Sequence, residues 1–321
     1  MSADFTPFGL AIGHQSDFAG ATGVTVIRGI TGPFRAAAAI IGRATGTREL
    51  DALSPAHLVD RVDAIVLTGG SAYGLGAADG VMRWMEERGR GFPVSSGVVP
   101  IVPAAVVFDL APLGSYQARP TPDMAYAACD RASSTDVEEG SVGAGTGTTV
   151  GKALGIERAM KAGLGCAVVQ AGELSAGAIA VVNAIGDVRD ENGRVIAGAR
   201  GDDGRFLDIA AQLRAGAALR SRFSELSLKN TTLAVVMTTA ALSRLELAQL
   251  AKASASALAR RITPVGTTYD GDVVFAIAPL SGAPAPLLQI ETMTTHALES
   301  AIERSVRLAR GRDGVPGLAD S

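Results

Sequence analysis

Residues 229–237 read KNTTLAVVM, a lysine and three small polar residues followed directly by an apolar run. The apolar run predicts a buried strand, and the polar residues before it are typical of a turn. The same arrangement also suits a self-cleaving N-terminal nucleophile. If the bond between Asn230 and Thr231 breaks, Thr231 gains a free α-amino group beside its hydroxyl, and one residue then holds both nucleophile and base. On this stretch alone both interpretations stay open.

The composition of the chain limits its class of partner. The 321 residues are 47% hydrophobic, which suffices for one large α/β domain or two small ones. The net charge is -3 with interspersed charges and aromatic residues make up 4%, so we expect no nucleic-acid partner and a small substrate. The N-terminus lacks the basic start of a signal peptide, and no uncharged apolar run reaches membrane-spanning length. These features predict a cytoplasmic protein without a membrane partner.

Cysteine and histidine give no signal for a disulfide or a metal. Cys129 and Cys166 have mainly small or apolar neighbours, which predicts buried thiols in a reducing compartment. The three histidines lie far apart, without the spacing of metal ligands. We therefore expect no metal site.

Hydrophobic periodicity predicts a mixed succession of strands and helices, which argues against a purely parallel sheet. We expect strands at 23–29, 64–67, 166–170, 178–185, from 194 onward, at 232–238 and at 273–278. Helices are expected at 74–88, 122–133, 207–219, 247–261 and 295–310. Ser243 and Glu246 match a capping box. Asn192-Gly193 predicts a hairpin turn between the strand at 178–185 and the one after it, and 138–152 predicts a glycine-rich loop.

Two glycine motifs resemble known catalytic loops and fail on spacing. The stretch 143–152 lacks the glycine and the hydroxyl residue that a phosphate-binding loop requires. Ser71 follows a predicted strand like a nucleophile elbow, but Tyr73 occupies the place of the second glycine. Ser71 is therefore interpreted as a turn residue, and a serine hydrolase that uses it is kept as a competing hypothesis.

Before the amine of Thr231 exists, self-cleavage needs other groups. Useful helpers are a carboxylate with a hydroxyl relay, a cation, and an amide that stabilises the oxyanion. The chain offers Asp270 with Thr268, Lys152 and Asn183. Asn183 is the least ordinary of them, because an amide inside an apolar strand costs free energy unless it is hydrogen-bonded. Singly, Asp270 and Thr268 fit a turn, and Lys152 a solvated surface charge, better than a catalytic role.

Together these residues resemble the L-aminopeptidase/D-esterase family of self-cleaving hydrolases, which includes β-peptidyl aminopeptidases and nylon-oligomer hydrolases. The resemblance covers nearly the whole chain through several long motifs in the same order: GVTVI at 23–27, IVLTGGSAYGLGAADGVM at 65–82, IVPAAVVFD at 101–109, GAGTG at 143–147, GK at 151–152, VNAIG at 182–186, NTT at 230–232 and YDGDVVFA at 269–276.

The resemblance implies an α/β (α+β) fold, a four-layer αββα sandwich of the N-terminal-nucleophile type. It implies cleavage between Asn230 and Thr231 into an α chain, residues 1–230, and a β chain, residues 231–321, which together form one structural domain. It further implies a homo-oligomer of such αβ units, a tetramer or larger, without metal or organic cofactor. By position, the five catalytic residues would be the nucleophile Thr231, the oxyanion donor Asn183, Lys152 near the nucleophile, and the relay pair Thr268 and Asp270.

The chain departs from the nylon-hydrolase branch at two places, because Phe108 replaces a tyrosine and Thr268 replaces a carboxylate. We therefore expect a self-processed amidohydrolase that acts on small peptides as an aminopeptidase through an acyl-enzyme ester at Thr231. One alternative is an endo-acting amidase on oligoamides such as nylon oligomers. Another is an unprocessed, non-enzymatic binding protein of the same fold.

Overall fold

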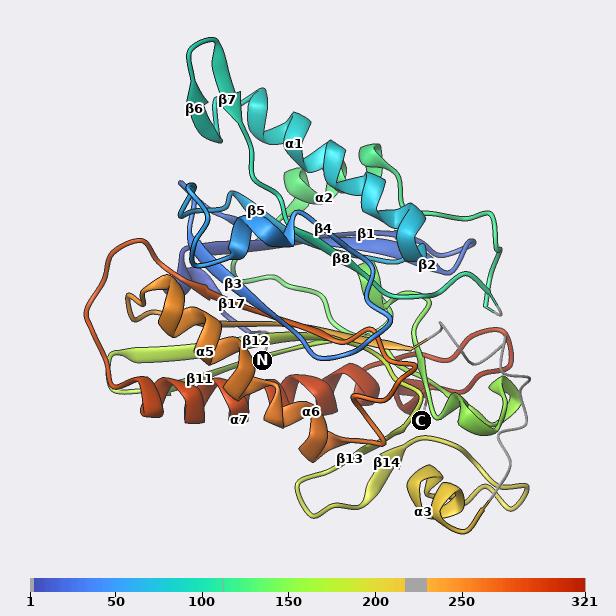
Figure 1. Ribbon diagram of the computed structural model, residues 1–321. Helices are drawn as coiled ribbons and strands as arrows, with labels where there is room; N and C mark the ends of the chain where they lie inside the picture. Colours follow the sequence, from blue (N-terminus) through green and yellow to red (C-terminus); the bar gives the residue numbers. More distant parts are fainter. Residues whose placement is uncertain (1–2, 112, 217–229, 321) are drawn as a thin grey trace.

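Two five-stranded sheets lie face to face, and helices cover their outer faces, so the chain forms four layers (Figure 1). The computed structural model describes residues 3–111, 113–216 and 230–320. This is the predicted αββα sandwich.

The first sheet has the strand order β1-β2-β5-β8-β4, with β5 and β8 parallel and the other pairs antiparallel. Its strands are β1 (Leu10–Asp17), β2 (Thr22–Gly29), β4 (Thr47–Arg48), β5 (Ala64–Thr68) and β8 (Ala104–Val106). The second sheet has the order β11-β12-β15-β17-β3, with β15 and β17 parallel. Its strands are β3 (Arg35–Ile40), β11 (Leu164–Ala171), β12 (Leu174–Asn183), β15 (Thr231–Thr238) and β17 (Val273–Ala278). Both sheets are mixed, as expected.

Three short sheets lie beside this pair. Their strands are β6 (Phe92–Val94) with β7 (Gly97–Val99), β9 (Thr149–Val150) with β10 (Met160–Lys161), and β13 (Asp187–Arg189) between β14 (Val195–Ala197) and β16 (Ile262–Thr263).

Helices form the two outer layers. On the first sheet lie α1 (Ala78–Glu86) and α2 (Pro122–Arg131); on the second lie α5 (Arg244–Ser254), α6 (Ser256–Arg261) and α7 (Leu287–Arg307); and α3 (Ile209–Arg214) lies near β13 and β14 (Figure 1). The predicted capping box of Ser243 and Glu246 is present at the start of α5. Within the described part of the chain, no helix is long and apolar enough to cross a membrane.

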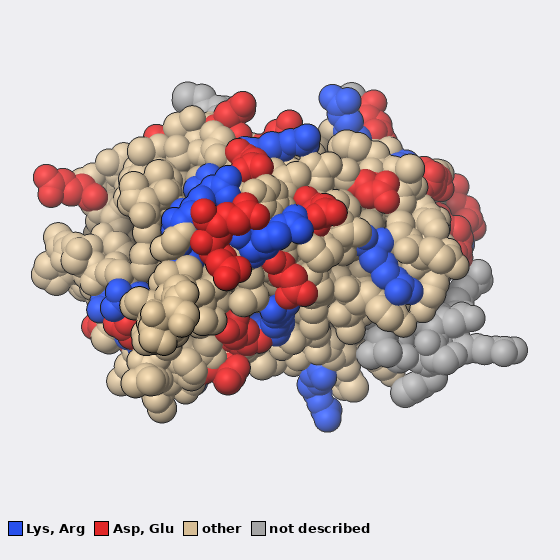
Figure 2. All heavy atoms as spheres, turned by 90° about the horizontal axis from the view of Figure 1, so that it is seen from above, with Lys and Arg blue, Asp and Glu red and all other residues tan. Residues whose placement is uncertain are grey.

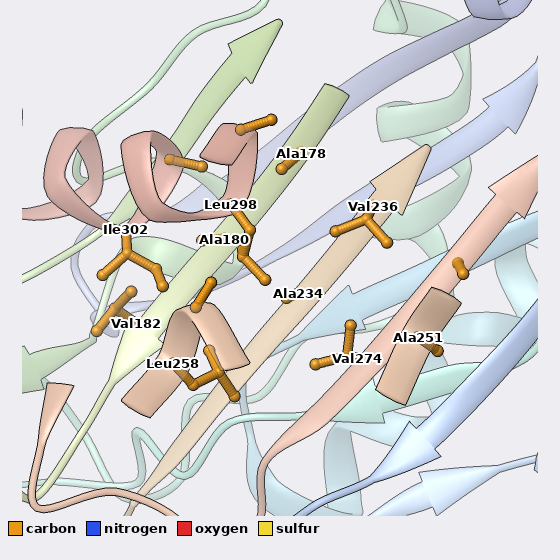
Figure 3. Close-up of a cluster of buried hydrophobic side chains, with 14 of the residues drawn as sticks. Ala178, Ala180, Val182, Ala234, Val236, Ala251, Leu258, Val274, Leu298 and Ile302 are labelled. Atoms are coloured by element: carbon orange, nitrogen blue, oxygen red, sulfur yellow. The ribbon is translucent and has the colours of Figure 1, made fainter. Parts of the chain in front are cut away.

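The central strand β15 explains why the sheets stack. Leu233, Val235 and Met237, every second residue of the strand, belong to the core between the two sheets. Ala234 and Val236 belong to the core between the second sheet and its helices, which Figure 3 shows. Because successive side chains of a strand point to opposite faces, an uninterrupted apolar run is buried on both sides. The small alanines on the helix face, such as Ala178 and Ala180, leave room for Leu298 of α7 (Figure 3).

The layer of α1 and α2 presents both signs of charge. Arg83 pairs with Asp123 and Arg88 with Asp130. The view onto this layer shows positive and negative side chains interspersed rather than a stripe of one sign (Figure 2).

Most predicted elements are present, but β1 and β3 of the two main sheets were not predicted, and further errors lie where a local signal was weak. The strand β13 is three residues long and was missed, so the turn at Asn192-Gly193 joins β13 and β14 rather than β12 and its successor. The helix predicted at 74–88 begins as a 3₁₀ helix (Ser71–Ala77), because the glycines there disfavour an α-helix. The last helix begins after Pro286, earlier than predicted. The helix predicted at 207–219 is α3, which ends at Arg214, and residues 217–219 of the prediction lie outside the described residues.

Candidate active site

The bond between Asn230 and Thr231 lies where three strands of the second sheet meet at one end. Thr231 opens β15 and stands opposite Asn183, the last residue of β12. On the other side, Asn230 forms a bridge to Asp270, just before β17. Asn183 and Asp270 are each 1% exposed, Asn230 is 2% and Thr231 5%. Sheet topology therefore brings together four of the predicted residues from distant parts of the sequence.

The Thr231 hydroxyl lies against the carbonyl group that precedes it. Its Oγ1 donates to the Asn230 carbonyl oxygen at 2.6 Å, and that oxygen also accepts the backbone N–H of Gly271 at 2.9 Å. A side chain at Gly271 would not fit, since its Cβ would lie 2.8 Å from Thr231 Oγ1 and 2.6 Å from the carbonyl oxygen of Ala44. The carbonyl of the predicted scissile bond is thus held between the Thr231 hydroxyl and a backbone hydrogen-bond donor.

The side-chain amide of Asn183 is fixed in one orientation. Its Oδ1 accepts from Lys152 Nζ at 2.7 Å and from the backbone N–H of Thr149 at 3.1 Å. Its Nδ2 donates to the carbonyl oxygen of Phe108 at 3.0 Å. Two donors on one side and an acceptor on the other exclude the flipped amide. The amide that is unusual in an apolar strand is therefore hydrogen-bonded, as its burial requires.

Lys152 reaches the site from the end of the glycine-rich loop. It opens the 3₁₀ helix Lys152–Leu154, directly after Gly151, whose φ of 77° favours glycine. Its Nζ also donates to the backbone oxygen of Asn183 at 3.1 Å. The ammonium is near enough to Asp270 to lower the pKa of that carboxyl. Lys152 is half-buried in this network rather than solvated at the surface.

Asp270 is a buried carboxyl bonded to its own turn. Its Oδ2 accepts the backbone N–H of Thr267 at 2.7 Å. Burial raises its pKa, while the Thr267 hydrogen bonds and the charge of Lys152 oppose the rise. Thr268, predicted as the relay hydroxyl, is exposed, and the structure records no hydrogen bond of its hydroxyl with another described residue. The threonine that contacts Asp270 here is Thr267, which was not predicted.

Asp272 is a second carboxyl of the site that was not predicted. Its Oδ1 accepts the backbone N–H of Thr232, the residue after Thr231, at 2.6 Å. Among the described residues its buried Oδ2 has no hydrogen-bond partner, and the same holds for the hydroxyl of Thr232. Burial, and next the charge of Asp270, raise the pKa of Asp272 to about 7. Asp272 could have been found in the sequence, because it is a carboxylate directly before the apolar strand in the stretch 269–276.

Phe108 and Ser71 are the two remaining residues that the sequence analysis singled out. Phe108 contributes its backbone oxygen to Asn183, a contact that does not depend on the side chain. Ser71 follows β5 of the first sheet with a φ of 51°, and its backbone N–H donates to the carbonyl oxygen of Val107. Its hydroxyl has no recorded hydrogen bond within the described ranges, which fits a turn residue.

One cavity of the domain lies apart from this network. A cavity of about 590 Å³ between the loop 138–146 and the segment 308–312 contains none of the predicted site residues. No group of three or more His, Cys, Asp and Glu side chains in the described ranges has the geometry of a metal site. On the side before Asn230, the description of the site ends at residue 230, since 217–229 are not described.

Comparisons with known proteins agree with this geometry. The sequence model of Peptidase family S58 matches residues 8–315. The chain is 43% identical over 280 residues to an uncharacterised aminopeptidase of Mycobacterium tuberculosis, covering 83% of this chain and 78% of that one. It is 31% identical over 281 residues to a 6-aminohexanoate-oligomer endohydrolase of Agromyces sp., covering 84% and 72%.

Among solved structures, the fold is similar to the L-aminopeptidase D-Ala-esterase/amidase of Ochrobactrum anthropi, described as a variant of the Ntn hydrolase fold. The TM-score is 0.70 at 18% identity, over 98% of this chain and 90% of that one. The fold is thus of the N-terminal-nucleophile type, with two mixed sheets between helices. A family match over nearly the whole length, together with relatives above 30% identity, shows that this chain belongs to Peptidase family S58.

Proposed function

We propose that this peptidase cleaves itself between Asn230 and Thr231 and then hydrolyses amide bonds of small peptides as an aminopeptidase, with Thr231 as its N-terminal nucleophile. The observation that carries the proposal is the 2.6 Å contact between Thr231 Oγ1 and the Asn230 carbonyl oxygen. Family membership and relatives named aminopeptidases support the activity.

Self-cleavage starts with attack of Thr231 Oγ1 on the Asn230 carbonyl carbon. A C–O bond forms, the C–N bond to Thr231 breaks, and the hydroxyl proton passes to the departing nitrogen, with Asp270 and the Thr268 hydroxyl as the proposed relay. The Gly271 N–H, which already donates to the Asn230 oxygen, and the Asn183 amide, which lies opposite Thr231, stabilise the negative charge that develops there. Water then hydrolyses the ester, which leaves a carboxylate on Asn230 and a free amine on Thr231.

Substrate hydrolysis reuses the same hydroxyl. The new α-amino group, with an ordinary pKa of about 7.7–8.0, accepts the proton of Oγ1 as it attacks a substrate amide. The fixed Nδ2 of Asn183 stabilises the oxyanion, and Lys152 holds that amide in place. The leaving amine takes up the proton, and water hydrolyses the acyl ester at Thr231.

The two chains would stay together after cleavage. The strands β15 and β17 of the β chain lie inside the second sheet, between β12 and β3 of the α chain. Their paired backbone groups and buried side chains would be exposed if the chains separated. We propose that such αβ units further assemble into a homo-oligomer of four or more, which light scattering of the purified protein would test.

Processing is tested by denaturing electrophoresis and intact mass. We expect fragments of about 23 and 9 kDa, in proportion to the 230 and 91 residues of a 32.6 kDa chain, and a new N-terminus at Thr231. Thr231→Ala should give one band of full length and no activity. A wild type that stays uncut yet hydrolyses amides contradicts the mechanism, and one that is uncut and inactive is the binding protein of the alternative hypothesis.

The substrate class is tested with amides of α-, β- and D-amino acids, each with a free and with an acetylated amine. An aminopeptidase loses activity on acetylation. Equal hydrolysis of both forms, or cleavage inside 6-aminohexanoate oligomers, would instead indicate the endo-acting amidase, the activity for which the Agromyces relative is named.

A further inference from the structure

Lys161 is a fully buried cation whose function no step above requires. It lies in β10, is 0% exposed, and its Nζ donates to the carbonyl oxygens of Gly145, Thr148 and Ala162 at 3.1, 2.9 and 2.5 Å. Each N–H of the ammonium thus has an acceptor. Burial lowers the pKa of Lys161 to about 7, and Arg312 adds to the lowering while the Asp109 charge opposes it. Burying a cation is costly, and an apolar side chain would fill the same space at less cost.

One of these acceptors belongs to a peptide group of the active site. The Thr148 carbonyl that accepts from Lys161 and the Thr149 N–H that donates to Asn183 Oδ1 are the two ends of the same peptide bond. A cation on a carbonyl oxygen polarises the amide and strengthens its N–H as a donor. It also fixes the plane of the peptide group, and with it the direction of that N–H.

The loop that carries this peptide depends on outside contacts for its shape. Between the 3₁₀ helix Gly143–Gly145 and β9, residues 146–148 form no regular structure. A Cβ at Gly145 would lie 2.5 Å from the Leu164 nitrogen, and one at Gly147 would lie 2.0 Å from the carbonyl oxygen of Ala21. Lys161 stands directly opposite Thr149 across the two-residue pairing of β9 and β10. It therefore ties the loop to the rest of the domain next to the site.

We propose that Lys161 is a positioning residue for both self-cleavage and hydrolysis, which orients the Asn183 amide through the peptide group 148–149. The inference rests on the proposed function, because it assigns the oxyanion role to Asn183. An oxyanion donor acts on charge that develops only in the transition state, so misplacing it lowers kcat and leaves KM nearly unchanged. Removing such a donor outright costs about 10²–10³ in kcat. An indirect loss of alignment should cost roughly 10- to 100-fold.

The test is Lys161→Met, which keeps the length of the side chain and removes the charge. We expect processing to slow and kcat per processed molecule to fall roughly 10- to 100-fold, with KM within about twofold. Lys252→Met makes the same chemical change on the exposed face of α5 and should match the wild type. Leu298→Ala, in the core between the second sheet and α7, is the control for lost stability, and it should keep its kcat at a temperature where both variants are folded.

A double-mutant cycle with Asn183→Ala separates positioning from a structural role. If Lys161 acts through Asn183, Lys161→Met should slow self-cleavage no further in the Asn183→Ala background. Additive losses, an unchanged kcat, or an equal loss in Leu298→Ala would overturn the inference. If Lys161→Met does not fold, Lys161→Gln, which keeps two N–H donors, gives the same comparison. A wild type that is not processed refutes the proposed function instead, whatever Lys161 does.

Discussion

A hydroxyl residue stands at a strand end in each sheet, and the two surroundings differ. Ser71 follows β5 of the first sheet in a glycine-rich turn. Its backbone N–H donates to the carbonyl oxygen of Val107, the residue directly after β8. Thr231 opens β15, where β12 and β17 supply an amide and two carboxyls. A turn motif places a hydroxyl, whereas reactivity depends on groups that other strands bring to it. Ser71 has the more suggestive local sequence and the poorer site.

The largest expected effect separates these two hydroxyls. Ser71→Ala should leave processing intact and kcat within a few-fold of wild type. Thr231→Ser, which keeps a hydroxyl, should be processed and active, in contrast to Thr231→Ala. Denaturing gels and initial rates measure both outcomes. Loss of activity in Ser71→Ala while processing continues would reverse the assignment and favour the serine hydrolase.

Asn183→Ala removes the amide that stands across the strand pair from Thr231. We expect kcat to fall by on the order of a hundredfold or more, with a small change in KM, because the oxyanion loses a fixed donor. Asn192→Ala, the same substitution in the exposed turn between β13 and β14, is the control. If both variants keep their kcat, the oxyanion is stabilised elsewhere.

Thr268→Val tests the relay at the third strand end. A hydroxyl that passes a proton between Asp270 and the nucleophile should be worth about tenfold or more in kcat and in the rate of processing. Thr292→Val on the exposed face of α7 makes the same change away from the site. Equal rates in the two variants would remove Thr268 from the mechanism and leave Thr267 as the threonine that acts on Asp270.

Sequence patterns predicted the layers well, because they depend on periodicity. The run after Thr231 is buried on both faces, as an uninterrupted apolar strand must be. The capping box at Ser243 was equally local and was also present. The strand β13 was missed because three residues show no period, and one of its two partners, β16, comes from a distant segment.

The site was predictable only in part, for a physical reason. Thr231 and Asn183 stood out as polar residues beside apolar strands, where an unbonded group is costly. Thr149, Gly271 and Lys161 contribute through the backbone or through a peptide group, and no side-chain pattern announces such roles. Whether Thr267 or Thr268 meets Asp270 depends on the path of one turn, which residue types do not determine.

The smallest expected effect concerns one buried carboxyl at each of the two strand ends, Asp109 near Ser71 and Asp272 near Thr231. Asp109, beside the Ser71 turn, has a partner on each oxygen, the hydroxyl of Thr22 at 2.8 Å and the N–H of Gly70 at 2.6 Å. Asp272 has a recorded partner on Oδ1 alone. In Asp109→Asn the side chain keeps only one oxygen, so its NH₂ must face either the N–H of Gly70 or the hydroxyl of Thr22. The first arrangement opposes two donors, and the second requires the Thr22 hydroxyl to rotate and accept. In Asp272→Asn the amide oxygen can still accept the N–H of Thr232, and the NH₂ takes the place of Oδ2.

Burial raises the pKa of both carboxyls, to about 6 for Asp109 and to about 7 for Asp272, so the pH dependence of unfolding ends at a different pH for each. The pKa of Asp272 is raised to about 7 in the folded state, so between its unfolded value near 3.8 and about 7 the native protein holds the extra proton. Its contribution to stability therefore falls as pH rises through this window, by up to about 1.4 kcal/mol per pH unit. Asp272→Asn cannot lose a proton, and in urea unfolding it should gain stability relative to wild type from pH 5 to pH 8. Asp109→Asn should gain relative to wild type only up to about pH 6, and above that pH it lacks one of the two acceptors that the carboxylate offers to Thr22 and Gly70. If Asp272→Asn instead loses stability relative to wild type as pH rises, the carboxylate itself holds the start of β15, and the two strand ends are anchored alike.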